Sequence, residues 1–126
     1  MKTNELRIGN HVSFNDVWCK VIGIDKDRVL VEYHNGNTDY CYIDYIDPIE
    51  LSEEILVKIG FKKFVKSFRM ELSGCRLDYF INKTLYIYKK HTDCCLIKDL
   101  EIKCEYVHQL QNSYFLLTSE ELEIEL

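Results

Sequence analysis

The first fifty residues alternate short apolar runs with polar turns, and this pattern constrains the fold more than any other feature of the chain. Asn35-Gly36 is a strong hairpin signal, because both residue types tolerate positive φ. Sheets of such short strands have to curl to hide their edges. We therefore predict a small SH3-like β-barrel over residues 1–50. Its strands are expected around residues 12–14, 17–24, 29–33 and 40–46.

The second half of the chain predicts an α+β arrangement. Ser52 is a good N-cap residue, and Gly60 suits the left-handed residue that ends a helix. We divide the chain into a barrel over 1–50 and an α+β half over 51–126, and we expect the two to share one core. The second half is expected to contain a helix at about 52–60, an antiparallel meander at about 66–102, a helix at about 106–118 and a terminal strand at about 121–126.

The charge and the chain start limit the function classes. The net charge is −5, and the lysines and arginines form no basic block of the kind that neutralises nucleic-acid phosphates, so nucleic-acid binding is disfavoured. The first ten residues contain no apolar run of signal-peptide length, and no stretch approaches the ~20 apolar residues that span a bilayer. We therefore expect a cytoplasmic protein without membrane attachment. In that compartment its six cysteines are expected to be reduced thiols.

Three stretches of the sequence carry a resemblance: Glu5-Leu6-Arg7-Ile8-Gly9-Asn10, Ile49 to Glu54 through Gly60-Phe61, and Tyr106-Val107-His108-Gln109-Leu110-Gln111-Asn112 with Tyr114-Phe115, Leu117-Thr118 and Glu120-Glu121-Leu122. They resemble a family of small proteins, without an assigned activity, from Bacteroidota genomes and their phages. The resemblance frames nearly the whole chain and implies an accessory role in a phage or mobile element, with no catalytic residue. Ser119 departs from the family, which usually has glycine there, as suits a helix C-terminus.

No set of residues in the sequence has the pattern of a catalytic or metal centre. Structural zinc needs paired ligands at short spacings, and the only cluster of potential ligands is His91 to Cys95. A cysteine nucleophile needs a base within hydrogen-bond reach, which only Cys94 or Cys95 with His91 or His108 could supply. We therefore expect no cofactor, no metal and no enzymatic activity.

Two groups of side chains are candidates for binding. Trp18, Tyr33, Tyr40 and Tyr42, with Tyr45, form an aromatic set in the barrel that either builds the core or lines a binding surface. His108, Gln111 and Asn112 lie together on the second helix. They form either a polar recognition face or a set of caps that fixes the helix on the sheet.

These features favour a non-enzymatic interaction protein that binds another protein through aromatic surface, since aromatic residues are enriched at interfaces. Two alternatives stay open: nucleic-acid binding through the barrel aromatics, and capture of a small molecule or nucleotide between the two halves. A homo-oligomer could also form by pairing of the terminal strand.

Overall fold

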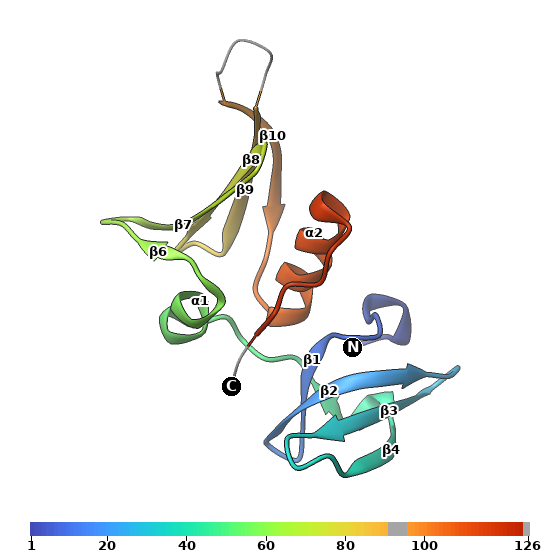
Figure 1. Ribbon diagram of the computed structural model, residues 1–126. Coiled ribbons are helices and arrows are strands. Elements are labelled where there is room, and N and C mark those ends of the chain that lie inside the picture. The colour runs from blue at the N-terminus through green and yellow to red at the C-terminus, as the bar shows by residue number, and fades with distance from the viewer. Residues whose placement is uncertain (91–95, 125–126) are drawn as a thin grey trace. The chain divides into compact units, whose positions relative to one another are not determined.

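The computed structural model describes residues 1–90 and 96–124, which form two compact units (Figure 1). Unit 1 contains Met1–Glu50 and Tyr106–Leu122. Unit 2 contains Leu51–Glu105 and the residues from Glu123 onward. The chain is a mixed α+β protein with mostly antiparallel strands in two sheets and two α-helices.

Unit 1 is built on one five-stranded antiparallel sheet in the order β4-β3-β2-β1-β5. The first three strands agree with the predicted ones, and a short 3-10 helix, η1 (Thr3–Glu5), precedes them. The single strand predicted at 40–46 is wrong over residues 43–45, which form a 3-10 helix between two separate strands. Asn15 and Asp16, between β1 and β2, both have positive φ, as a two-residue hairpin requires. The elements are β1 (His11–Phe14), β2 (Val17–Ile24), β3 (Arg28–Tyr33), β4 (Thr38–Tyr42), a second 3-10 helix η2 (Ile43–Tyr45) and β5 (Ile46–Asp47).

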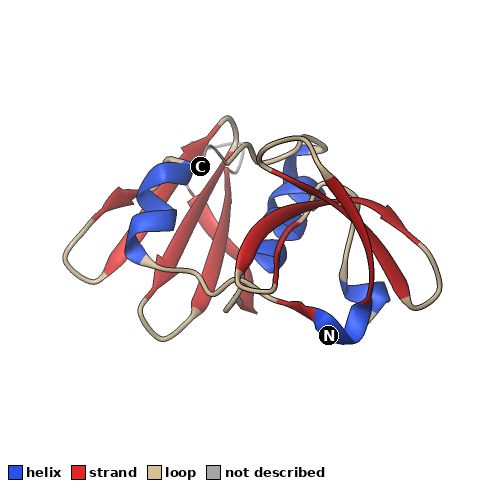
Figure 2. Cartoon of the chain, turned by 90° about the horizontal axis from the view of Figure 1, so that it is seen from below, coloured by secondary structure: helices blue, strands red, loops and turns tan. Residues whose placement is uncertain are grey.

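The short connection η2 forces this sheet to curl. It joins the two edge strands, β4 and β5. Four Cα steps from Tyr42 to Ile46 span at most roughly 14 Å, whereas the edges of a flat five-stranded sheet lie roughly 19 Å apart. The sheet is therefore a curled half-barrel, as Figure 2 shows for the strands near the N-terminus. Its interior is filled by one cluster of buried side chains: Leu6, Val12, Cys19, Val21, Val29, Val31, Cys41, Ile43 and Ile46.

Unit 2 combines a short helix with a second antiparallel sheet. In the helix α1 (Glu53–Ile59), Ser52 accepts a hydrogen bond from the Ile55 amide, and Gly60 ends the helix at φ +119°, so both cap predictions are confirmed. The sheet order is β10-β9-β8-β7-β6, which confirms the meander. Its strands are β6 (Lys62–Lys63), β7 (Ser67–Leu72), β8 (Cys75–Phe80), β9 (Thr84–Lys90) and β10 (Leu96–Lys103).

One face of the second sheet carries the buried apolar side chains of its strands. These side chains alternate along three neighbouring strands, and α1 and the residue after its cap contribute further apolar groups. The buried apolar residues are Phe68, Leu77, Tyr79, Leu85 and Ile87 on the strands, with Leu56, Ile59, Phe61 and Cys104. The hydroxyl of Tyr79 donates a hydrogen bond to the carbonyl of Cys104 over 2.8 Å.

The second helix, α2 (Val107–Thr118), belongs to unit 1 and not to the C-terminal half in which sequence analysis placed it. The reason is a set of long-range hydrogen bonds that the local sequence does not reveal. Glu50 and Tyr106 form an isolated β-bridge, and the amide of Val107 donates to the carbonyl of Ile49 over 2.8 Å. Residues 51–105 are therefore inserted between two segments of unit 1.

The predicted terminal strand at 121–126 is wrong for the residues that the structure describes, since Glu121 to Ile124 form no strand. Leu122 is buried and Glu121 is exposed, so the alternation is real. The alternation arises because the side chain of Glu121 forms an ion pair with Arg7 while the next side chain, Leu122, is buried. No ladder of strand hydrogen bonds is needed for this pattern.

Ser119 ends α2 with φ +60°, in the left-handed region that favours glycine. We predict that Ser119→Gly raises the free energy of unfolding by about 0.5–1 kcal/mol, because glycine has no Cβ to clash in this conformation. Ser113→Gly, inside the same helix, should lower it by about 0.5 kcal/mol. Urea unfolding of both variants tests this. A destabilised Ser119→Gly would contradict the prediction.

Candidate functional site

The open end of the curled sheet in unit 1 exposes side chains that belong to its interior face. Side chains of a strand alternate between two faces, so residues two apart share a face. Phe14, Val17, Tyr33 and Asp39 each lie two residues beyond a member of the buried cluster, namely Val12, Cys19, Val31 and Cys41. They are only half-buried or exposed, because the interior opens to solvent at these strand ends.

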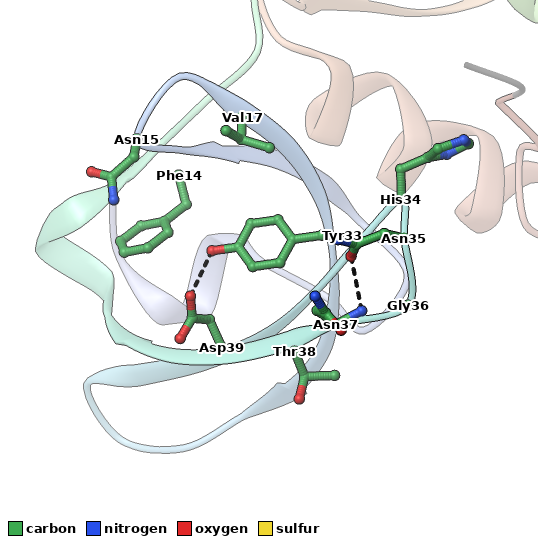
Figure 3. Close-up of a pocket in the computed structure, with 10 residues that line it drawn as sticks. All are labelled: Phe14, Asn15, Val17, Tyr33, His34, Asn35, Gly36, Asn37, Thr38 and Asp39. Carbon is green, nitrogen blue, oxygen red and sulfur yellow. Dashed lines mark hydrogen bonds between the residues drawn. The ribbon is translucent and has the colours of Figure 1, made fainter.

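These four residues line an open pocket of about 1000 Å³, which we call the mouth (Figure 3). Its apolar part comes from β1, β2 and β3, where Val17 is 48% exposed and the rings of Phe14 and Tyr33 pack partly on the core. Polar turn residues complete the lining: Asn15, His34, Asn35, Gly36, Asn37 and Thr38. The mouth therefore has an apolar centre with a polar rim.

Tyr33 and Asp39 form a hydrogen-bonded pair inside the mouth. The hydroxyl of Tyr33 donates to Oδ2 of Asp39 over 2.8 Å (Figure 3). Burial and this hydrogen bond raise the pKa of Tyr33 to about 12, so the phenol remains a donor at neutral pH. Among the residues that line the mouth, Asp39 is the only Asp, Glu, Lys or Arg.

Tyr40 and Tyr42 lie on the outer face of β4, away from the core side that carries Cys41. The guanidinium of Arg28 lies 5.5 Å from the ring centre of Tyr40 and 4.7 Å from that of Tyr42. Arg28 also donates to the Tyr42 hydroxyl over 3.0 Å, and the Tyr40 hydroxyl donates to Asp25 over 3.1 Å. The structure thus separates the predicted aromatic set, with Tyr33 in the mouth and these two tyrosines outside it. Tyr45 lies on η2 and is 67% exposed.

Trp18 makes its own contact with a histidine. Its Nε1–H donates to Nδ1 of His11 over 2.6 Å, and the two rings meet edge to face at 5.7 Å. Burial and the nearby Lys20 lower the pKa of His11 to about 4. The neutral imidazole is required here, because a protonated Nδ1 could not accept the tryptophan hydrogen bond. Trp18 is therefore half-buried against a partner and does not line the mouth.

Gln111, on α2, is 1% exposed and uses its side-chain amide within the chain. Its Oε1 accepts from the amide of His11 over 2.8 Å, and its Nε2 donates to the carbonyl of Gly9 over 3.1 Å. Both backbone groups stand at the beginning of β1, where β2 pairs with one side of the strand and β5 pairs with the other side only from Ser13 onward. Gln111 thus caps a strand end, which is the second of the two roles considered from the sequence.

Asn112 makes a similar set of contacts next to it. Its Oδ1 accepts from Nδ2 of Asn10 over 2.8 Å and from Nε of Arg7 over 3.2 Å. Its Nδ2 donates to the carbonyl of Glu5 over 3.2 Å. His108 is 3% exposed and stacks on Tyr106, and burial lowers its pKa. This side of α2 therefore faces the protein and offers no polar recognition surface.

The cysteines in the described part of the chain are buried or half-buried. Cys19, Cys41 and Cys104 are buried and Cys75 is half-buried, and burial raises the pKa of all four, to about 11 for Cys19 and about 12 for Cys104. No group of three His, Cys, Asp or Glu in residues 1–90 and 96–124 could hold a metal ion. The candidate ligands and nucleophiles His91, Cys94 and Cys95 lie outside the described residues.

Sequence reasoning found Tyr33 but missed the other residues of the mouth. In the sequence Phe14 shows only the alternation of a strand, and no local pattern distinguishes Asp39. Both residues lie on the same side of their strands as buried core residues, and both are next to a turn. This combination is the sequence feature that could indicate the mouth. That signal becomes useful only once the sheet is known to curl.

Comparisons with known proteins add no family to this description. No protein-family model, no curated protein and no solved structure matches the chain. Neither of the two described α-helices has the length and apolar character needed to cross a membrane. The function therefore has to be argued from the geometry above.

We predict that His11 titrates with a midpoint of about 4 in the folded chain. Between that value and the unfolded value of about 6.5, only the unfolded chain binds this proton, so His11 makes the free energy of unfolding fall as the pH is lowered through this interval. Trp18→Phe removes the donor to Nδ1 and should raise the midpoint. NMR titration of the His11 ring checks both, with Tyr40→Phe as the control. A wild-type midpoint near 6.5 would show that the contact is absent.

We predict that Gln111→Ala lowers the free energy of unfolding by about 2–4 kcal/mol. It leaves the His11 amide and the Gly9 carbonyl without their partner, and each unsatisfied buried group costs about 1–3 kcal/mol. The matched control is Leu116→Ala on the same helix, where the side chain is 84% exposed. Its effect should stay within about 0.5 kcal/mol. Equal effects of the two substitutions in urea unfolding would refute the role of Gln111.

Proposed function

We propose that this chain is a non-enzymatic protein-binding module whose mouth holds an extended segment of a partner protein. The observation that carries the proposal is the mouth itself, where Val17 is exposed and Phe14 and Tyr33 are only half-buried at the open end of the curled sheet. Apolar groups at a binding centre surrounded by a polar rim are typical of protein interfaces. The phage or mobile-element setting implied by the sequence resemblance is part of this proposal.

We further propose that unit 1 is an SH3-like barrel. Three features support this: the strand order β4-β3-β2-β1-β5, the short helix η2 between the last two strands, and the pairing of β5 with β1. Small barrels of this kind bind extended peptides in aromatic-lined grooves. The aromatic rings of the mouth are consistent with that mode.

The charge of the mouth favours a peptide over a nucleic acid. No lysine or arginine is among its lining residues, and its one charged lining group is the carboxylate of Asp39. Phosphate groups would meet repulsion there and gain no counter-charge. The exposed amide and hydroxyl side chains of the rim, on Asn15, Asn35 and Thr38, suit hydrogen bonds to a peptide backbone.

We predict that selection of a random 12-residue peptide library on the full chain enriches specific sequences that bind in the mouth. Val17→Ser should weaken their binding about tenfold, which corresponds to the ~1.4 kcal/mol expected for an apolar contact at the centre. Ile24→Ser is the matched control, because Ile24 is an exposed apolar residue (38% against 48% for Val17) at the other end of β2. Isothermal titration calorimetry measures both. If no sequence is enriched, or if both variants bind alike, the mouth is not the binding site.

A further inference from the structure

The mouth contains a carboxylate that has no cation beside it. Asp39 accepts a hydrogen bond from Tyr33, and within residues 1–90 and 96–124 no lysine or arginine forms an ion pair with it. A second acid, Asp16, is exposed in the turn between the lining residues Asn15 and Val17. Besides Asp39 and the phenol of Tyr33, the only ionisable group among the lining residues is the imidazole of His34, which Figure 3 shows directed away from Tyr33 and Asp39.

Elsewhere in the described part of the chain, aromatic rings next to carboxylates are covered by cations of the protein itself. Arg7 lies 4.2 Å from the ring centre of Phe115 and pairs with Glu121. Arg69 lies 4.7 Å from that of Phe64 and is 2.9 Å from Asp78. In both cases one cation lies over an aromatic ring and next to a carboxylate. The quadrupole of the ring and the negative charge of the carboxylate both attract the cation.

The closest internal parallel to the mouth is the set Tyr86, Lys98 and Glu101 on β9 and β10. Tyr86 hydrogen-bonds to Glu101 through its side chain, as Tyr33 does to Asp39. The ammonium of Lys98 lies 5.2 Å from the ring centre of Tyr86 and 3.6 Å from Glu101. The pair of Tyr86 and Glu101 thus holds a lysine ammonium, and the pair of Tyr40 and Asp25 has a cation nearby as well, the guanidinium of Arg28 at 5.5 Å from the Tyr40 ring centre.

We propose that the mouth holds a lysine side chain of the partner protein, with its ammonium at Asp39 and its methylene stem between Phe14 and Tyr33. The inference rests on the proposed function and names the chemistry of the residue that anchors the bound segment. A lysine suits the mouth because its stem is apolar and its head is charged, which matches an apolar lining that ends in a carboxylate. Tyr33 keeps that carboxylate oriented through its hydroxyl.

The test uses the ¹⁵N-labelled full chain and two small probes, Nα-acetyl-lysine N-methylamide and its norleucine analogue, which has the same chain length without a charge. The lysine probe should shift the amide signals of Tyr33 to Asp39, and the norleucine probe should bind about threefold more weakly, the size expected of an exposed ion pair. Asp39→Asn should weaken binding of the lysine probe by a similar factor. Asp44→Asn, an exposed acid on η2 that does not line the mouth, is the matched control and should leave binding unchanged.

The outcomes separate this inference from the proposed function. If library peptides bind and respond to Val17→Ser, but carry no lysine and ignore Asp39→Asn, then the mouth binds peptides and the lysine anchor is wrong. If the two probes shift the same amides equally, the charge has no role and the inference also fails. If neither the library nor either probe binds, the proposed function and the inference fail together.

Discussion

The hydrogen bonds of Gln111 hold unit 1 together, because they join its two segments across 100 residues of sequence. One buried side-chain amide satisfies both the amide of His11 and the carbonyl of Gly9 at the beginning of β1, where β2 pairs with the strand but β5 does not yet. At the other side of the same junction, the bridge between Glu50 and Tyr106 brings the chain back after the 51–105 insertion. Residues 51–105 are therefore inserted in the chain between Glu50 and Tyr106, whose positions the contacts within unit 1 determine.

The dependence of unit 1 on long-range hydrogen bonds explains why the fold was predictable only in part. Turns, helix caps and strand alternation are local signals, and Asn35-Gly36, Ser52 and Gly60 therefore indicated the correct elements. The unit to which α2 belongs depends on partners about 100 residues away, which no local pattern encodes. For Gln111 and Asn112 the sequence left two roles open, since an amide that caps a strand end and one that binds a ligand have the same local surroundings.

The mouth is a consequence of how the first sheet closes. Because η2 connects the edge strands within three residues, the interior is narrow, and Val12, Val21, Val29 and Val31 fill it completely at 0% exposure. The next inward positions along each strand find no further layer to pack against. A tyrosine suits such a position, since its ring can lie on the core while its hydroxyl reaches a partner at the surface. This is the environment of Tyr33, which the sequence could only describe as core or surface.

In the binding that we propose, Asp39 would give the mouth selectivity more than affinity. It lies at an exposed position, where water screens a charge and an ion pair contributes little free energy. A ligand with an uncharged head would gain nothing from it, however, and a phosphate or carboxylate would be repelled, so the carboxylate would discriminate between ligands that the apolar lining alone would accept. The rings of Phe14 and Tyr33 would then supply most of the contact area. Affinity and specificity would thus come from different atoms of one small site, which the short interior of the curled sheet leaves open.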